Sequence, residues 1–119
     1  YGSSLPPRLS ELAILTTARI WDASFEWETH RPHAPAAGVS ENVIKALADD
    51  RAPEFEAKDE KLVYLFAREL NLKRSVSDLL FERTVSCLGR DGTVDLVGVL
   101  GYYGLISMTI KAFDIPPPS

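Results

Sequence analysis

Both histidines of the chain, His30 and His33, lie in one short segment, FEWETHRPHA, which also contains Glu26. If this segment is helical, Glu26 and His30 are four residues apart and share one face. A histidine titrates near neutral pH, and a neighbouring carboxylate fixes its tautomer and raises its basicity, so the pair suits proton transfer. The alternative is an ordinary solvated helix face, where such a pair contributes only about 0.2–0.5 kcal/mol.

Glu11 is the third candidate for this chemistry, because it lies at the edge of an apolar stripe in the preceding segment. If the two segments pack as an antiparallel helix pair, Glu11 and the Glu26/His30 face meet in one half-buried pocket. Glu26, His30 and His33 could instead supply three metal ligands. Their spacing matches no established metal motif and Pro32 disturbs the backbone between the histidines, so we predict no metal site.

The composition indicates one soluble domain spanning residues 1–119. With 13 basic and 17 acidic residues the net charge is -4, so we expect no nucleic-acid partner. Cys87 is the sole cysteine, which excludes an intramolecular disulfide and a CxxC pair and favours a reducing, cytoplasmic setting.

The most apolar run, from Val94 to Ile110, is shorter than the ~20 residues that span a bilayer and contains Asp95. We therefore interpret it as a buried helix and expect no membrane contact. The chain opens without a signal-peptide pattern, and because it begins at Tyr1 we expect an upstream segment to be missing.

Helical spacing of apolar residues dominates, and no segment alternates like a strand for more than a few residues. The sequence therefore predicts an all-α, single-domain bundle of about six helices. In the first half we expect a helix over 8–21, a second from a Ser24 cap toward Gly38 with a kink or break near Arg31, and a short helix capped by Ser40. A charged loop over 51–58 should follow, and then a helix starting near Lys58. The second half should contain a helix from a Ser77 cap to Gly89, a long apolar helix capped by Thr93, and a proline-rich tail over 114–119.

Gly98, Gly101 and Gly104 recur every three residues in the last helix, at a cost of roughly 1 kcal/mol each relative to alanine. Small residues let another backbone approach closely, so a helix-helix or subunit contact would offset this cost. A locally irregular helix is the alternative. Tyr102 and Tyr103 beside them either line a pocket or fill the core.

The segment RLSELAILTTARIWDASFEWETHRPHAPAAGVSENVIKAL resembles the signature half of the carboxymuconolactone decarboxylase family, which belongs to the alkylhydroperoxidase D-like superfamily. The matching motifs are R-x-x-E-L-A-I-L from Arg8, aromatic-E-W-x-x-H from Phe25, and H-x-x-x-A-x-x-A-G-V-S from His30. The later VDLVGVLGYYGLISMTIKAF and the closing prolines resemble the last helix and tail of the family. The resemblance implies an all-helical homo-oligomer, often trimeric or hexameric, with sites close to subunit contacts.

Position by position, His30 matches the motif histidine and Glu11 the glutamate of the first helix of the family. Ala23 and Glu26 stand where the peroxidase branch has its two cysteines, and neither side chain supplies sulfur. The resemblance therefore favours the decarboxylase branch, which works without cysteine, metal or organic cofactor.

We accordingly predict a cofactor-independent decarboxylase that acts on a small carboxylated lactone or related enolisable acid. His30 would move the proton, Glu26 or Glu11 would orient it, and Tyr102 or Tyr103 would donate to the developing oxyanion.

Three further residues outside the proton-transfer group are candidates for binding the substrate. Trp27 is a candidate substrate contact, although such a residue more often packs in a core, and Arg19 or Arg31 could hold the substrate carboxylate. The alternatives are a non-catalytic module for oligomerisation or small-molecule binding, and a thiol oxidoreductase that uses Cys87, which we expect to be buried.

Overall fold

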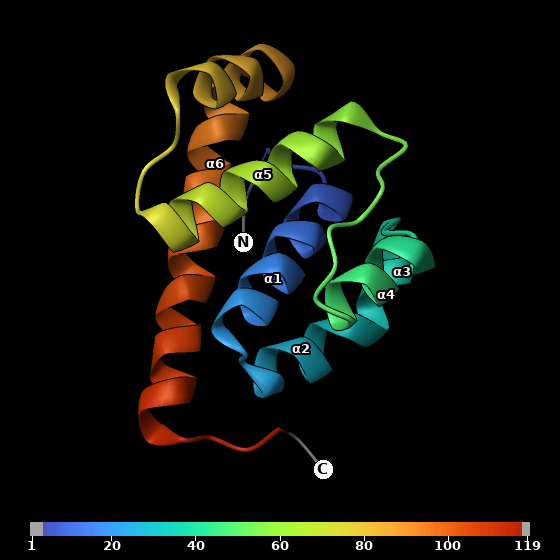
Figure 1. Cartoon of the computed structure of the whole chain (residues 1–119), viewed down its shortest axis with the longest axis vertical. Coiled ribbons are helices and arrows are strands. Elements are labelled where there is room, and N and C mark those ends of the chain that lie inside the picture. Colours follow the sequence, from blue (N-terminus) through green and yellow to red (C-terminus); the bar gives the residue numbers. More distant parts are fainter. Residues whose placement is uncertain (1–3, 118–119) are drawn as a thin grey trace.

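The computed structural model describes residues 4–117 and contains no strand among them, and 78% of these residues are helical (Figure 1). The all-α prediction is thus confirmed. The elements are α1 Pro7–Trp21, α2 Ser24–His30, a 3-10 turn η1 Arg31–His33, α3 Ala34–Ala37, α4 Glu41–Ala48, α5 Lys58–Lys73 and α6 Asp78–Phe113. The count of about six stays a prediction, because it depends on how the short turns and the kinked α6 are counted.

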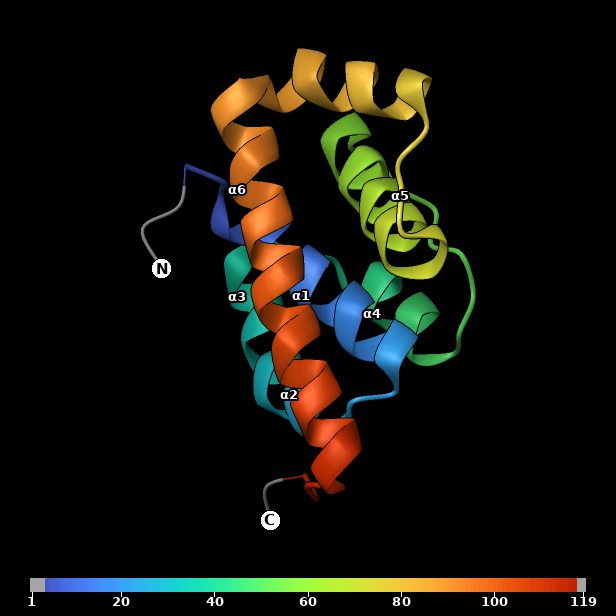
Figure 2. The same ribbon diagram turned by 90° about the vertical axis from the view of Figure 1, so that its left-hand side faces the viewer.

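Helix α1 forms the centre of the fold, with α5 and α6 on one side and α2 to α4 on the other (Figures 1 and 2). Every residue from Leu12 to Ala18 is buried, so α1 has no wide solvent-facing side over this stretch. The core cluster joins α1 to Val43 and Ile44 of α4, Phe66 of α5 and further apolar residues of α6. Consequently, groups on different faces of α1 contact different neighbouring helices.

The predicted break near Arg31 is confirmed by η1, which begins at that residue. Pro32 and Pro35 occupy early positions of η1 and α3, where a missing backbone N–H costs little. The Ser40 cap is also confirmed, since the N–H of Val43 donates to Ser40 Oγ at 3.2 Å. The prediction that Ser24 caps α2 was wrong. The residue at the capping position is Ala23, whose side chain has no atom that can accept a hydrogen bond, and no side chain caps this helix.

Gly89 kinks α6 because its backbone has φ 77° and ψ 171°, a conformation outside the helical region. A short arm, residues 78–88, therefore runs across the end of the molecule, and a long arm, residues 90–113, turns away from it along α1 (Figure 2). The predicted helix end at Gly89 is consistent with this kink. The Thr93 cap was wrong, because Thr93 lies inside the long arm and its Oγ1 donates to the carbonyl of Gly89 at 2.7 Å.

Ser77 does precede α6, but its hydroxyl makes no capping hydrogen bond, and its backbone N–H instead donates to Glu69 Oε1 at 3.0 Å. The expectation that Cys87 is buried was wrong, since Cys87 is a free, exposed thiol on the short arm. After Asp114, which ends α6, the tail is non-helical as far as residue 117, and residues 118–119 lie outside the described part.

The long arm is buried on one side only, which corrects the prediction of a buried helix over Val94 to Ile110. Leu96, Val99 and Leu100 face the core, whereas Val94 is 64% and Leu105 60% exposed. Helix α6 is also long and apolar enough to cross a membrane, a criterion that core helices of soluble proteins meet as well, and 33% of its most apolar window is buried.

Arg8 ties the start of α1 to the start of α5. Its guanidinium donates to both carboxylate oxygens of Asp59, at 3.0 and 2.7 Å, and to Glu60 Oε2 at 2.6 Å. These bonds raise the pKa of Arg8 above its ordinary value and lower that of Asp59 below its own. Arg8 thereby fixes the N-terminal turns of α1, which carry Glu11.

Candidate functional site

The imidazole of His30 lies between two carboxylates that come from different helices. Its Nδ1 is 3.1 Å from Oε2 and 3.4 Å from Oε1 of Glu11, which α1 supplies. Its Nε2 is 3.3 Å from Oε2 of Glu26, one turn earlier on α2. The packing of α1 against α2 therefore brings together the three side chains that the sequence singled out as catalytic candidates.

This group is sheltered from solvent. The side chains of His30 and Glu11 are 18% and 19% exposed, and that of Glu26 is 8% exposed. Although Glu26 Oε2 is within ion-pair distance of Nε2, it makes no hydrogen bond of good geometry to any residue that the structure describes. Glu26 thus carries a buried oxygen whose hydrogen-bonding capacity is unused.

Both His30 and Glu26 have raised pKa values, for different reasons. The hydrogen bond to Glu11 is the main cause for His30; burial opposes it, and the charges of Glu11 and Glu26 add to it. Burial is the main cause of the raised pKa of Glu26, with the attraction of His30 opposing it and the Glu11 charge adding to it. Both shifts favour the protonated form of the group concerned, so the site tends to hold a proton that acid-base chemistry can use.

Tyr103 of α6 completes the group. Its ring meets the imidazole of His30 edge-to-face, with centroids 5.2 Å apart and planes at 88°, and Tyr102 packs on it in the same manner at 5.0 Å. Burial, followed by the charges of Glu26 and Glu11, raises the pKa of Tyr103. Its phenol therefore stays protonated and available as a hydrogen-bond donor.

A cavity of about 600 Å³ opens beside this group, within the range of ~300–1,000 Å³ typical of small-molecule sites. Glu11, Ser10, Tyr102 and Tyr103 supply its polar lining, and the apolar lining consists of Leu5, Pro7, Ile14 and Val99. His30 and Glu26 are not part of the lining. A ligand in the cavity would thus contact Glu11 and Tyr103 directly, and His30 would act on it through Glu11.

The remaining candidates lie elsewhere. Trp27 packs against the core and lines a different hollow together with Arg19. Arg31 is paired with Glu41 at 3.4 Å, and His33 is exposed. No lysine or arginine lines the Glu11 cavity among residues 4–117, so neither arginine holds the position that we expected for a carboxylate anchor.

Ser10 lines the cavity but was not recognised from the sequence. Its only signal was its place next to Glu11, which does not distinguish it from any other serine in a first helical turn. As for metals, the described residues contain no group of three or more His, Cys, Asp or Glu side chains that could hold an ion.

No protein-family model matches the chain, and no curated protein matches it either. The resemblance to carboxymuconolactone decarboxylases consequently stays a prediction that depends on the three motifs. The chemistry of the Glu11, His30, Glu26 and Tyr103 group has to support any assignment of function.

Proposed function

We propose that the protein is a cofactor-independent decarboxylase that acts on a small carboxylated lactone or related enolisable acid in the Glu11 cavity. The observation that carries the proposal is the imidazole of His30 held between Glu26 and Glu11, the carboxylate that lines that cavity. This arrangement offers a transferable proton at a sheltered site without using sulfur.

Decarboxylation breaks the bond between the carboxyl carbon and its neighbour and leaves the electron pair as an enolate. The Tyr103 phenol can donate a hydrogen bond to the enolate oxygen, because its raised pKa keeps it protonated. A proton must then reach carbon. Glu11 is the group that faces the cavity, so the proton passes from Nδ1 of protonated His30 through the Glu11 carboxyl to carbon, while the imidazole keeps its Nε2 proton facing Glu26. A proton from water restores Nδ1 before the next turnover.

The charge of the site is compatible with an anionic substrate. When Glu26 keeps its proton, the negative charge of Glu11 and the positive charge of His30 cancel. The substrate carboxylate would then lie against apolar residues such as Leu5 and Val99, with no cation from the described lining to hold its charge in place. Charge that is not held in this way moves more readily into the enolate.

Carbon dioxide release from a panel of carboxylated lactones and β-keto acids tests the proposal. Replacing His30 with glutamine should abolish release while leaving the helical circular dichroism signal intact. His33→Gln is the matched control, because this exposed histidine is three residues away and should be dispensable. Unchanged activity of the His30→Gln variant would remove His30 from the mechanism, and a wild-type chain that decarboxylates no panel member would reject the reaction.

A second candidate function is small-molecule binding without chemistry, in a helical module that also serves oligomerisation. The position of His30 and Glu26 behind the cavity wall favours it. Ligand binding that shifts the NMR signals of Tyr103 without any turnover would support this function.

A thiol peroxidase is less compatible with the geometry, because Cys87 lies on the short arm of α6, whereas Tyr103 is on the long arm. Alkylating Cys87 should leave every activity unchanged.

We further propose that the chain self-associates, as a trimer or hexamer, through the exposed stripe of α6. This stripe consists of Val94, Val97, Gly101, Leu105 and Met108, all exposed and spaced to share one face. It contains no charged side chain, so a second copy can face it without like-charge repulsion. Gly101 has open space where a Cβ would lie, which allows a close backbone approach.

Light scattering after size-exclusion chromatography tests this assembly. Leu105→Glu should reduce the wild-type mass toward that of one chain, because the contact would bury an unpaired charge. Leu79→Glu is the control, since Leu79 is similarly exposed on the short arm, outside the stripe. A wild-type monomer, or equal effects of the two variants, would contradict the proposal of self-association.

A cytoplasmic location is proposed as well, supported only by the free thiol of Cys87.

A further inference from the structure

A second cavity, of about 360 Å³, lies between α1, the turn after α4 and α5. It shares no lining residue with the Glu11 cavity, because Thr16 and Ile20 line it from a different face of α1. Three arginines line it, Arg19, Arg51 and Arg68, against a single acidic residue, Asp50. The lining itself therefore carries two more positive than negative charges, although Asp22 and Asp49 lie just outside it.

The three guanidinium groups are poorly matched by carboxylates. The nearest to Arg19 are Asp22 at 3.7 Å and Asp50 at 4.0 Å, distances too long for hydrogen bonds. Arg51 has only Asp49, at 3.5 Å. None of the three guanidinium groups donates a hydrogen bond to any residue of the described chain.

Arg68 has no ion-pair partner among residues 4–117; its guanidinium carbon lies 5.7 Å from the ring centroid of Tyr64. Arg8 shows the contrast, since its guanidinium makes three short hydrogen bonds to Asp59 and Glu60. This protein neutralises an arginine fully where it joins two helices, whereas the donors at the second cavity remain available.

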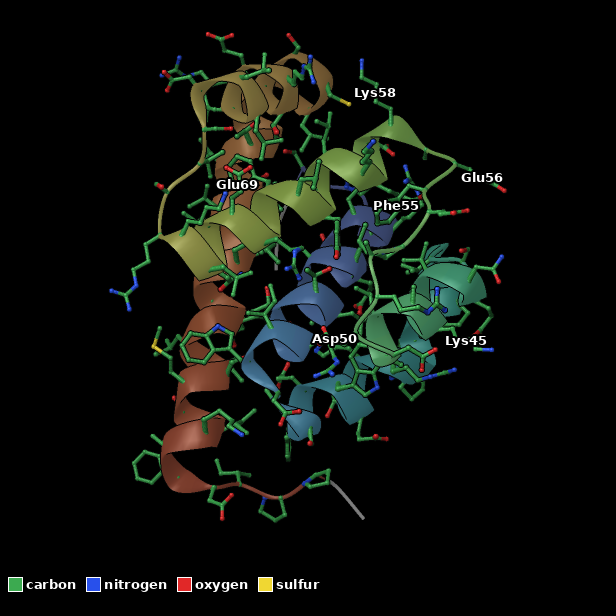
Figure 3. All side chains as sticks on the ribbon, viewed as in Figure 1. Lys45, Asp50, Phe55, Glu56, Lys58 and Glu69 are labelled. Atoms are coloured by element: carbon green, nitrogen blue, oxygen red, sulfur yellow. The ribbon has the colours of Figure 1, made fainter. Side chains whose placement is uncertain are left out.

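The backbone holds Arg51 at the cavity edge. Asp50, labelled in Figure 3, adopts φ 57° at the turn after α4, alongside α1. The N–H of Arg51 donates to the carbonyl of Ala46 at 2.8 Å and that of Asp50 to Leu47 at 3.1 Å, which is the double hydrogen bond of a Schellman motif. Arg51 therefore extends from an ordered helix end.

Apart from Thr16 and Asp50, the rest of the lining is apolar or aromatic, with Ile20, Leu47, Leu65 and Tyr64 beside the arginines. Guanidinium groups bind carboxylate and phosphate oxygens through paired N–H donors, and a cavity lined by one sign of charge concentrates ions of the opposite sign. We propose that this cavity binds a small organic oxyanion, a carboxylate or a phosphate, attached to an apolar body. The site is independent of the proposed decarboxylation.

Titration of the full chain with three probes, followed by NMR of the arginine Nε–Hε signals, tests the proposal. The probes are inorganic phosphate, phenyl phosphate and phthalate. We expect saturable shifts of Arg19, Arg51 and Arg68, with a probe that carries a ring binding about tenfold tighter than inorganic phosphate, because the ring buries apolar surface against Ile20 and Leu65. Saturation by phenyl phosphate alone assigns a phosphate, saturation by phthalate alone assigns a carboxylate, and saturation by both assigns their shared oxyanion chemistry.

Arg51→Gln and Arg68→Gln should each weaken binding about tenfold, because each removes a charge-assisted donor. Arg90→Gln, an exposed arginine on α6, changes the net charge equally and should bind like wild type. The proposal is overturned if no probe shifts the three signals, if Arg90 shifts as much as they do, or if both cavity variants bind like wild type.

Discussion

Replacing Glu26 with glutamine should make the protein more stable at alkaline pH, although it changes a residue of the candidate site. The side chain of Glu26 is 8% exposed, and its Oε2 has no hydrogen-bond partner among the described residues. Glutamine has the same shape but no charge to bury. The expected gain measures the cost at which the fold keeps a carboxylate in this place.

The magnitude follows from two opposing effects. A buried polar group without a partner costs ~1–3 kcal/mol, and a charged group costs more. His30, whose Nε2 is 3.3 Å away, recovers part of this cost while it is protonated. We therefore expect Glu26→Gln to raise the free energy of unfolding by about 1 kcal/mol once His30 is neutral, which for a chain of 119 residues corresponds to about 4 °C in Tm.

The pH dependence gives the sharper test. The pKa of Glu26 is raised in the folded state, so its contribution to stability is complete below the ordinary value of 4.5 and is lost as the pH rises through the raised value. The pKa of His30 is raised as well, from 6.5, so its stabilising contribution is lost as the pH rises through its own raised value. The advantage of Glu26→Gln should thus be near zero in acid and grow until both groups have lost their protons.

Urea unfolding followed by circular dichroism at a series of pH values measures this difference. Glu28→Gln is the matched control, because Glu28 is exposed on the same helix and should behave like wild type throughout. A Glu26→Gln variant that is less stable than wild type at alkaline pH, or a Glu28→Gln variant with the same pH-dependent gain, would contradict a buried charge at Glu26 as the cause.

Two further substitutions test how the fold holds the site. Arg8→Ala should lower the free energy of unfolding by about 2 kcal/mol in urea, since it removes three charge-assisted hydrogen bonds that are partly screened by solvent. Because the pKa of Asp59 is lowered in the folded state, the stability difference between wild type and Arg8→Ala should shrink as the pH falls through this lowered pKa. A difference that stays constant with pH would contradict the ion pair as its cause. Gly89→Ala should cost ~1–3 kcal/mol in thermal unfolding, because its φ of 77° and ψ of 171° suit glycine almost alone; an unchanged Tm would show that the kink relaxes freely.

Where helices begin and break could be predicted from the sequence, because short-range backbone chemistry decides these points. Pro32 and Pro35 cannot continue a regular helix, and the structure changes to a 3-10 turn at Arg31. The Ser40 hydroxyl accepts the hydrogen bond expected of a cap. The errors at Ser24 and Thr93 have the same origin, since several residues near a helix start can cap it and the sequence does not choose among them.

The sequence also determined that Glu26 and His30 share a face, because a spacing of four residues guarantees it on any helix. Only the tertiary structure decided that Glu11 meets them, that the cavity presents Glu11 and Tyr103 in place of His30, and that Leu105 faces solvent while Val99 faces the core. The same holds for Arg19, Arg51 and Arg68, which come from three separate segments. The physical reason is that local spacing fixes which side chains share a face of one helix, whereas burial and pairing depend on which other helix packs there.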